Sequence, residues 1–303
     1  MTISLLPTES DVHAAADRIR RYVRRTPMLR ADVDGRPVVF KLEHLQRTGS
    51  FKLRGALNAL LVGPRPNRVI TASGGNHGLA VATAAALVDL PATIYLPESA
   101  PAGKARRIEA IGARLVRFGE TYAVAAAEAR RAASELGARY LHAYDDAAVV
   151  GGQGTVAAEV ITDAPDVTAI AVAVGGGGLA AGTVLGAAGR AVVAVEPERC
   201  CCFHAALDAG EPVDSAVDSI AASGLGASRV GDIPFALLRA AGATSVLVSD
   251  AELVAARDRL WEEFRLAVEP AAAAPFAAWL AGRVPESLTC VVLCGANTDW
   301  LPV

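Results

Sequence analysis

Lys52 stands where the chain passes from a short apolar stretch, residues 38–40, into a segment with helical periodicity. The apolar positions of residues 51–61 repeat as they do on one face of a helix. Gly49 supplies a turn and Ser50 a capping hydroxyl at the join, so we expect Lys52 in the first turn of a largely buried helix. Burial and the helix dipole both disfavour the ammonium form there. A lysine with a lowered pKa suits Schiff-base chemistry, and the alternative is a lysine that anchors a phosphate without a covalent bond.

Four consecutive glycines form a second candidate for chemistry. Gly175, Gly176, Gly177 and Gly178 follow an apolar stretch, and a helix-like segment begins at Leu179. Glycines let several backbone N–H groups turn toward one point, and the positive end of a helix favours an anion there. The pattern predicts a phosphate cradle, and its alternative is a flexible turn. It lacks the Lys-Ser/Thr of a P-loop and differs from GxGxxG, which disfavours nucleoside triphosphates and dinucleotides.

A third candidate is a turn of small and polar residues after an expected strand over 68–72. Ser73, Gly74, Asn76 and His77 lie in this turn or at the start of the following helix. The serine, the asparagine and the N–H groups of a helix N-terminus can hold a carboxylate. Asn76 can instead face a phenolic oxygen, and the simplest alternative is an N-capping serine before an ordinary helix.

A thiol ends the last expected strand, residues 288–294. Cys294 lies at the carboxyl end of that strand, where ligands bind in α/β sheets. A small buried hydrophobic residue is an equally good interpretation of this cysteine. Cys290 is expected on the opposite face or in the core.

Composition limits the classes of function. With 303 residues, 52% of them hydrophobic, the chain can form one or two domains, and its net charge of −3 gives no reason to expect a nucleic acid or an anionic membrane as partner. Residues 167–189 carry no charge, but the glycines in their middle would break a membrane helix, so a strand, a turn and a helix are expected there. Five cysteines without a CxxC pair or a zinc-like histidine spacing favour a reducing cytoplasm.

Strand-like and helix-like segments alternate along the chain. The expected strands are 36–43, 68–72, 92–97, 113–118, 139–143, 168–175, 191–196, 244–249 and 288–294. The expected helices include 76–88, 101–112, 121–137, 177–188 and 250–266. This alternation predicts an α/β fold with mainly parallel sheets covered by helices on both faces. Nine strands suggest two doubly wound domains: a large one from residues 1–65 and 146–303 and a small one from 66–145, with the candidate site between them.

The sequence around Lys52 resembles the lysine motif of the pyridoxal-phosphate-dependent serine/threonine dehydratases. The motif comprises KLE at 41–43 and GSFKLRGA at 49–56. Further motifs follow in the family's order: SGGNH at 73–77, GGQGT at 151–155, the glycine tetrad, VEP at 195–197, EP at 269–270 and CGAN at 294–297. The resemblance covers roughly residues 20–300 and implies fold type II, the tryptophan-synthase-β-like fold.

The resemblance implies a role for each candidate residue around the cofactor. Lys52 would form the Schiff base with pyridoxal phosphate and take the Cα proton of the substrate. The four glycines and Leu179 would bind the cofactor phosphate through their main chain, and Asn76 would bond the ring hydroxyl. Phe51 would pack beside the ring, and Cys294 would face the pyridine nitrogen, where many relatives have serine.

The same resemblance implies how the substrate is held. Ser73, Gly74, Asn76 and His77 would hold its carboxylate, and Tyr144 lies in the region that selects the side chain. Serine racemases resemble this chain too, but they carry a second serine where it has Gly74, as a base on the opposite face of the ring. Racemisation is therefore expected to be slow. A homodimer is the family's expected assembly.

Cys294 also favours one type of reaction. A neutral thiol cannot keep a proton on the pyridine nitrogen as a carboxylate would, so the ring is a weaker electron sink and β-elimination is favoured over transamination. The sequence predicts dehydration of an L-β-hydroxy amino acid, L-threonine or L-serine, to a 2-oxo acid and ammonia. The alternatives are a serine-racemase-like enzyme, a β-replacement enzyme, and a protein that binds the cofactor and amino acids without turnover.

A divalent metal site is not expected. Relatives use the glutamate of the Val-Glu-Pro motif and an acid six residues further on. In this chain Glu196 is followed at that distance by Cys202, which favours a monovalent cation or none.

Overall fold

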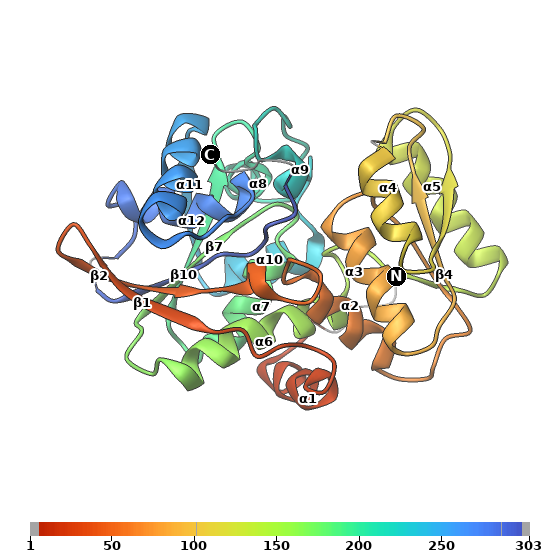
Figure 1. Cartoon of the computed structure of the whole chain (residues 1–303), viewed down its shortest axis with the longest axis horizontal. Helices are drawn as coiled ribbons and strands as arrows, with labels where there is room; N and C mark the ends of the chain where they lie inside the picture. Colours follow the sequence, from red (N-terminus) through yellow and green to blue (C-terminus); the bar gives the residue numbers. More distant parts are fainter. Residues whose placement is uncertain (1–5, 101, 286, 299–303) are drawn as a thin grey trace.

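The computed structural model describes residues 6–100, 102–285 and 287–298. Its helices surround two sheets, one of six strands and one of four, which occupy the two halves of the molecule in Figure 1. The strand order is β1-β2-β10-β7-β8-β9 in the larger sheet and β5-β4-β3-β6 in the smaller one.

The strands are β1 (Met28–Val33), β2 (Arg36–Lys41), β3 (Val69–Ala72), β4 (Ala92–Leu96), β5 (Arg114–Arg117), β6 (Arg139–Tyr140), β7 (Ala169–Ala173), β8 (Ala191–Pro197), β9 (Thr244–Val248) and β10 (Thr289–Val292). The helices are α1 (Glu9–Ile19), α2 (Lys52–Leu61), α3 (Asn76–Leu87), α4 (Ala102–Glu109), α5 (Tyr122–Glu135), α6 (Ala147–Asp163), α7 (Gly178–Gly186), α8 (Cys202–Ala209), α9 (Ala222–Leu225), α10 (Asp232–Ala240), α11 (Asp250–Phe264) and α12 (Pro270–Leu280).

The larger sheet is parallel except at one edge, where β1 runs antiparallel to β2. Its central strand β7, AIAVA, is buried along its whole length. Helix α12 packs on one face of this sheet and α7 on the other (Figure 1). A continuous apolar strand of this kind is typical of a parallel sheet that is covered on both faces.

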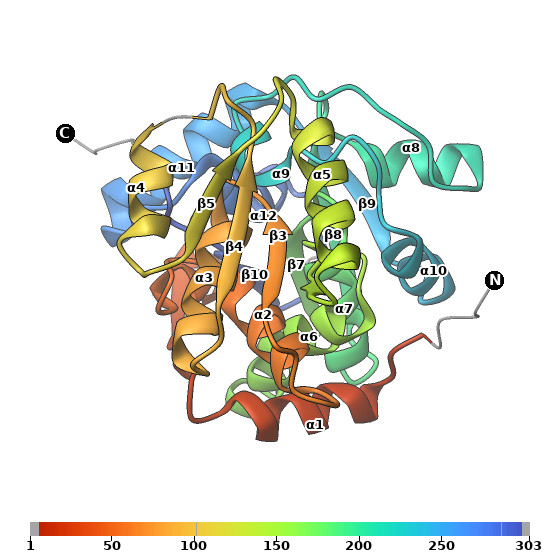
Figure 2. The ribbon, with the colours of Figure 1, turned by 90° about the vertical axis from the view of Figure 1, so that its right-hand side faces the viewer.

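The smaller sheet is parallel throughout. Figure 2 shows it with α3 and α4 on one side and α5 on the other. Two separate apolar clusters lie on its two faces: Ile70 and Tyr95 belong to the cluster with α5, and Val69 and Ile94 to the cluster with α3. This alternation along β3 and β4 follows from the two-residue period of a strand.

Helix α2 lies between the two halves, because it packs against α1 and α6 of the larger half and α3 of the smaller half. Its buried apolar residues join the cluster that extends under α3. Lys52, the first residue of α2, is therefore placed at the junction of the two sheets.

The expected α/β fold with mainly parallel sheets is confirmed, and each of the nine expected strands overlaps an observed one. The strands within residues 66–145 form the smaller sheet and the others the larger one. The division into domains at 65/66 and 145/146 stays a prediction that this arrangement supports. Strand β1 was not expected from the sequence, although Asp34 and Gly35, with φ of 54° and 74°, are an Asp-Gly hairpin signal.

Residues 167–189 fold into β7, the glycine turn and α7, as expected. Within the described part of the chain no helix is long and apolar enough to cross a membrane.

Candidate active site

Lys52 is the first residue of α2, but Ser50 does not cap this helix as expected. The N-cap is Phe51, and it makes no side-chain capping bond. Ser50 forms an isolated β-bridge with Gly295, and the Phe51 N–H donates to Cys294 O at 3.1 Å. This pairing keeps the chain extended up to residue 50, so the helix starts one residue later than a serine cap requires, and the buried Ser50 hydroxyl has no hydrogen-bond partner among the described residues.

The surroundings of the Lys52 amine favour its neutral form. Nζ donates to the Ala143 carbonyl at 3.1 Å and lies 5.0 Å from the centre of the Phe51 ring. Burial lowers the pKa of Lys52 to about 8, and the neighbouring Cys294 and Glu269 oppose this only in part. An amine that is substantially neutral near pH 8 is a competent nucleophile and base.

A buried group of charged side chains fixes the base of α2. Arg54 pairs with Glu43 and with Glu159, at 2.8 Å in each case, and Lys41 pairs with Glu159 at 2.6 Å. Arg54, Glu43 and Lys41 are at most 1% exposed. Because these partners come from β2, the segment after it and α6, they hold the lysine helix to the larger half of the molecule.

The four glycines lie between β7 and α7, the place that the cradle prediction requires. The carbonyl of Gly175 accepts from Cys202 Sγ at 3.1 Å, and the carbonyl of Gly176 accepts from the Gly231 N–H at 3.1 Å. In a trans peptide the N–H points away from the carbonyl of the same unit, so the N–H groups of Gly176 and Gly177 face the opposite side. These N–H groups lie at the N-terminus of α7, whose N-cap is Gly177, and a helix N-terminus favours an anion.

The cradle has no space for side chains. A Cβ at Gly176 would lie 2.3 Å from ring atoms of Tyr144, and one at Gly177, where φ is 91°, would lie 2.7 Å from Pro234. The Tyr144 hydroxyl donates to the Arg229 carbonyl at 3.2 Å. Tyr144 therefore closes the cradle from outside and links it to the segment before α10.

The N-cap of α3 is a glycine and not the serine that the simplest alternative suggested. Gly75 is the N-cap of α3, and the Ser73 hydroxyl accepts from the Gly75 N–H at 3.2 Å. The His77 ring faces inward, with Nε2 3.0 Å from Thr71 Oγ1 and 3.2 Å from Leu141 O. Burial lowers the pKa of His77 to about 3, so the ring is neutral. The ring is therefore turned away from the turn, and the backbone N–H of His77 lies in the first turn of α3.

All the site residues named from the sequence line two adjoining cavities. The first, of about 40 Å³, is lined by Phe51, Lys52, Asn76, Tyr144, Gly175, Gly176, Gly177, Gly178, Leu179 and Cys294, among others. The second, a cleft of about 320 Å³, is lined by Ser73, Gly74 and His77 and shares Lys52, Asn76, Tyr144 and Gly176 with the first. The three candidate motifs therefore meet at one place between the two sheets.

Glu269 also lines the first cavity, although it was not among the site residues predicted from the sequence. It is 4% exposed, and both of its carboxylate oxygens accept from Asn76 Nδ2, at 2.8 and 3.1 Å. The signal for it was the Glu-Pro pair at the start of α12, which by itself indicates only a helix N-terminus. The partner that makes it part of the site lies 193 residues away.

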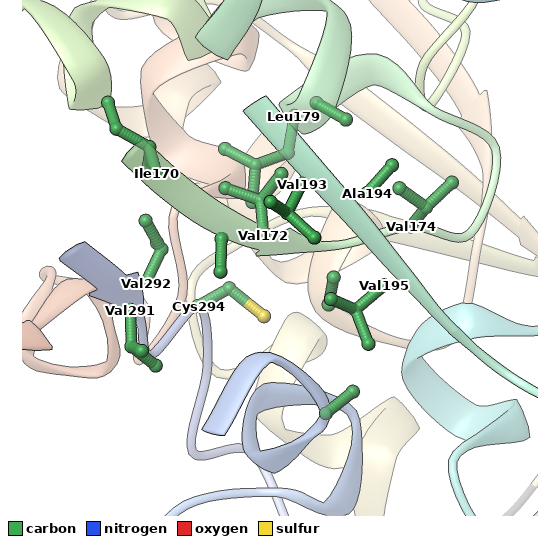
Figure 3. Packing of buried hydrophobic residues seen from close by; sticks show 14 of the residues in the cluster. Ile170, Val172, Val174, Leu179, Val193, Ala194, Val195, Val291, Val292 and Cys294 are labelled. Carbon is green, nitrogen blue, oxygen red and sulfur yellow. The ribbon is translucent and has the colours of Figure 1, made fainter. Parts of the chain in front are cut away.

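Cys294 lies just beyond β10 against the core residues of the larger sheet (Figure 3). Burial raises the pKa of its thiol above the ordinary value, so the sulfur stays protonated. Cys290 is fully buried in the core, as expected.

Glu196 and Cys202, at the positions where relatives bind a divalent metal, form hydrogen bonds within the protein. The Glu196 carboxylate accepts from the N–H groups of Phe203 and His204, at 2.8 Å each, and Cys202 bonds to the glycine cradle. Over the described residues no cluster of three His, Cys, Asp or Glu side chains is placed to hold a metal ion.

A primary amine with a lowered pKa thus lies in one cavity with a glycine cradle for an anion, in a two-sheet α/β protein. These features define a class: enzymes that hold a phosphorylated carbonyl cofactor by its phosphate and bond it through a lysine. The residues fit pyridoxal phosphate, because the cradle suits its phosphate and Asn76 and Cys294 provide polar groups for its ring.

The chain belongs to the pyridoxal-phosphate-dependent enzyme family, whose model matches residues 19–295. It is 38% identical to the L-threonine ammonia-lyase of Geobacter sulfurreducens, over 95% of this chain and 75% of that protein. It is 35% identical to the L-threo-3-hydroxyaspartate ammonia-lyase of Saccharomyces cerevisiae, over 97% of this chain and 94% of that protein. A serine racemase of Arabidopsis thaliana is 31% identical, over 95% of this chain and 92% of that protein.

The structure is similar to the crystal structure of a threonine deaminase from T.th., with a TM-score of 0.92. The two are 34% identical, and the match covers 98% of this chain and 100% of the other. The expected dependence on pyridoxal phosphate is thereby confirmed, and an enzyme is favoured over a protein that only binds the cofactor.

Proposed function

We propose that this enzyme removes water from an L-β-hydroxy amino acid, L-threonine or L-serine, and releases a 2-oxo acid and ammonia. Bound pyridoxal phosphate supplies the electron sink that lets the Cα–H and Cβ–O bonds break. The water that leaves is balanced by the water that later hydrolyses the released enamine to the oxo acid and ammonia.

The observation that carries this proposal is that Lys52 is the one base in the cleft with a pKa near neutrality. Among the other described titratable groups that line the cleft, His77 points inward, and burial raises the pKa of Tyr144 above that of a free phenol. The pKa of Tyr122 is raised as well, although this side chain is half exposed. Gly74 has no side chain to act as a second base. A single base can remove the Cα proton from one face, after which the β-hydroxyl leaves. Racemisation would need a second base to return a proton to Cα from the other face.

The lining of the cleft supports a neutral substrate side chain. Among its described residues Lys52 is the only Lys or Arg, and the remaining ones are small, aromatic or uncharged polar residues. A second carboxylate on the substrate would lose water there without gaining a cationic partner, which is costly. This favours threonine or serine over 3-hydroxyaspartate as the substrate.

The test is a panel of amino acids incubated with the holoenzyme, with 2-oxo acid and D-serine measured separately. We expect 2-oxo acid from L-threonine or L-serine, at least about tenfold less from L-threo-3-hydroxyaspartate, since a carboxylate left without a partner costs a few kcal/mol, and little D-serine. Rapid turnover of hydroxyaspartate alone would reverse the substrate assignment, and D-serine as the main product would replace elimination by racemisation.

A variant pair ties the activity to Lys52. Lys52→Ala removes the base, and Lys52→Arg keeps a positive charge that cannot lose its proton. Both are expected to abolish 2-oxo acid formation while the protein still folds. Turnover that survives in either variant would contradict the role of this residue.

A further inference from the structure

The geometry points to Glu269 as a positioning residue for the cofactor: it orients the amide of Asn76 so that one N–H faces the ring hydroxyl. This role concerns the cofactor and holds whichever amino acid is the substrate.

The carboxylate of Glu269 is itself fixed in place. Glu269 is the N-cap of α12, and its backbone N–H donates to Gly295 O at 3.1 Å. A Cβ at Gly295 would lie 2.3 Å from Glu269 Oε1, and one at Gly224 would lie 3.5 Å from the same oxygen. Glycine at residue 295 therefore leaves the space that the carboxylate occupies.

The amide of Asn76 is held from both ends. Its Nδ2 donates to Glu269, and its Oδ1 accepts from Asn297 Nδ2 at 2.8 Å. Asn297 in turn donates to the Thr48 carbonyl at 2.8 Å. With the oxygen of the amide facing Asn297, the amide cannot turn over without losing bonds at both ends.

This arrangement leaves one N–H of Asn76 for the cavity. The two oxygens of Glu269 belong to one carboxylate and approach Nδ2 from one side, so they use one of its two N–H groups. Among the described residues the second N–H has no further acceptor, so it can donate to a hydroxyl or phenolate oxygen of a ligand. An amide oxygen in its place could not donate to a phenolate. Without Glu269 the amide would be held by its bond to Asn297 alone, and it could rotate so that its N–H no longer faces the cavity.

Two substitutions separate orientation from charge. Glu269→Gln has the same shape and keeps an oxygen that accepts from Asn76, but it loses the charge. Glu269→Asp keeps the charge and is a good N-cap, but its side chain is one methylene too short to reach Asn76. Glu262→Gln, at an exposed position of α11, is the matched control for the loss of one negative charge.

The measurement is the dissociation constant of pyridoxal phosphate from each apoprotein, by absorbance titration, together with the melting temperature of each apoprotein. We expect Glu262→Gln to match the parent protein and Glu269→Gln to stay within about threefold of it. Glu269→Asp and Glu269→Ala are expected to bind about tenfold more weakly, the loss of one charge-assisted hydrogen bond.

A double-substitution cycle with Asn76→Ala tests whether Glu269 acts through Asn76. In the Asn76→Ala background, Glu269→Ala should change the affinity by less than about twofold, because the group it orients is gone. An equal loss in both backgrounds, or tight binding by Glu269→Asp with weak binding by Glu269→Gln, would overturn the inference. If Glu269→Ala does not fold, the order of the Gln and Asp variants decides. Failure of the substrate panel would leave this result unaffected.

Discussion

Among single residues, Lys52 owes its reactivity to burial. A lysine in water loses its proton near pH 10.4, but burial lowers the pKa of Lys52 to about 8. Only the neutral amine attacks a carbonyl. The pH at which the apoprotein captures its cofactor is therefore set by the packing around α2.

We predict that the rate of cofactor capture by the apoprotein rises with pH from about 6 and levels off above about pH 9, because the pKa of Lys52 is about 8. The sign follows from the lowered pKa, because Lys52 loses its proton at a lower pH than a lysine in water does. Stopped-flow absorbance at a fixed concentration of pyridoxal phosphate measures this profile. A rate that keeps rising to pH 10 would show that the amine is not perturbed.

In the proposed function, elimination is favoured over racemisation because Gly74 has no side chain that could act as a second base. Gly74→Ser would add a hydroxyl to the cleft, and we expect it to raise D-serine formation from L-serine at least about tenfold, since a positioned base contributes a hundredfold or more. A Cβ at this position would lie 3.2 Å from Leu96 Cδ2, so Leu96 must shift slightly.

Gly74→Ala is the control for that substitution, because it meets Leu96 in the same way but carries no hydroxyl. Chiral chromatography of the products compares the two variants. Equal D-serine from the serine and alanine variants would mean that residue 74 does not supply the second base.

The sequence was most informative where the function of a residue depends on its neighbours in the chain. The order of strand, turn and helix at the four glycines and before α3 was predicted correctly, because these elements are consecutive in the chain. Ser50 was misplaced because its pairing with Gly295, 245 positions later by residue number, extends the strand-like segment. Glu269 was missed for the same reason, since its bond to Asn76 is visible only in the folded chain.

At the scale of elements, the glycine loop between β7 and α7 depends on close contact with Tyr144. We predict that Gly176→Ala weakens binding of pyridoxal phosphate at least about tenfold, because its Cβ would lie 2.3 Å from the Tyr144 ring and force the loop or the ring to move. Absorbance titration of the apoprotein measures the affinity.

Gly151→Ala is the matched control for the glycine loop. This buried glycine lies within α6, and a Cβ there meets its nearest neighbours at an ordinary 3.7 Å. Its affinity for the cofactor should be unchanged, and alanine should favour the helix slightly. Normal cofactor affinity in Gly176→Ala would show that the loop tolerates a side chain and that Tyr144 is free to move.

Element types were easier to predict than their partners. The apolar runs of the parallel strands and the periodicity of the amphipathic helices are local patterns in the sequence. Nine of the strands were therefore predicted. The edge strand β1 was missed because residues 28–33 mix exposed and half-buried positions instead of forming an apolar run. The order of strands within each sheet depends on crossover connections, which no local pattern specifies.

Over the whole molecule, the site combines groups from both sheets. Asn76 and the turn before α3 belong to the smaller half, whereas the glycine cradle, Glu269 and Cys294 belong to the larger half. Lys52 lies on the helix between them. A homodimer stays a prediction.

The hydrogen-bonded chain from the smaller half to the larger one has a thermodynamic consequence. Arg107 of α4 donates to Asn297 at 2.8 Å, Asn297 donates to Asn76, and Asn76 donates to Glu269. A cofactor that binds the oriented Asn76 has a higher affinity for the protein when these bonds join the two halves than when the halves are apart. By linkage, the bound cofactor stabilises the joined arrangement of the two halves by a certain free energy. The joined arrangement strengthens cofactor binding by the same free energy. The stability of the contact between the halves and the affinity for the cofactor therefore both report this one coupling free energy.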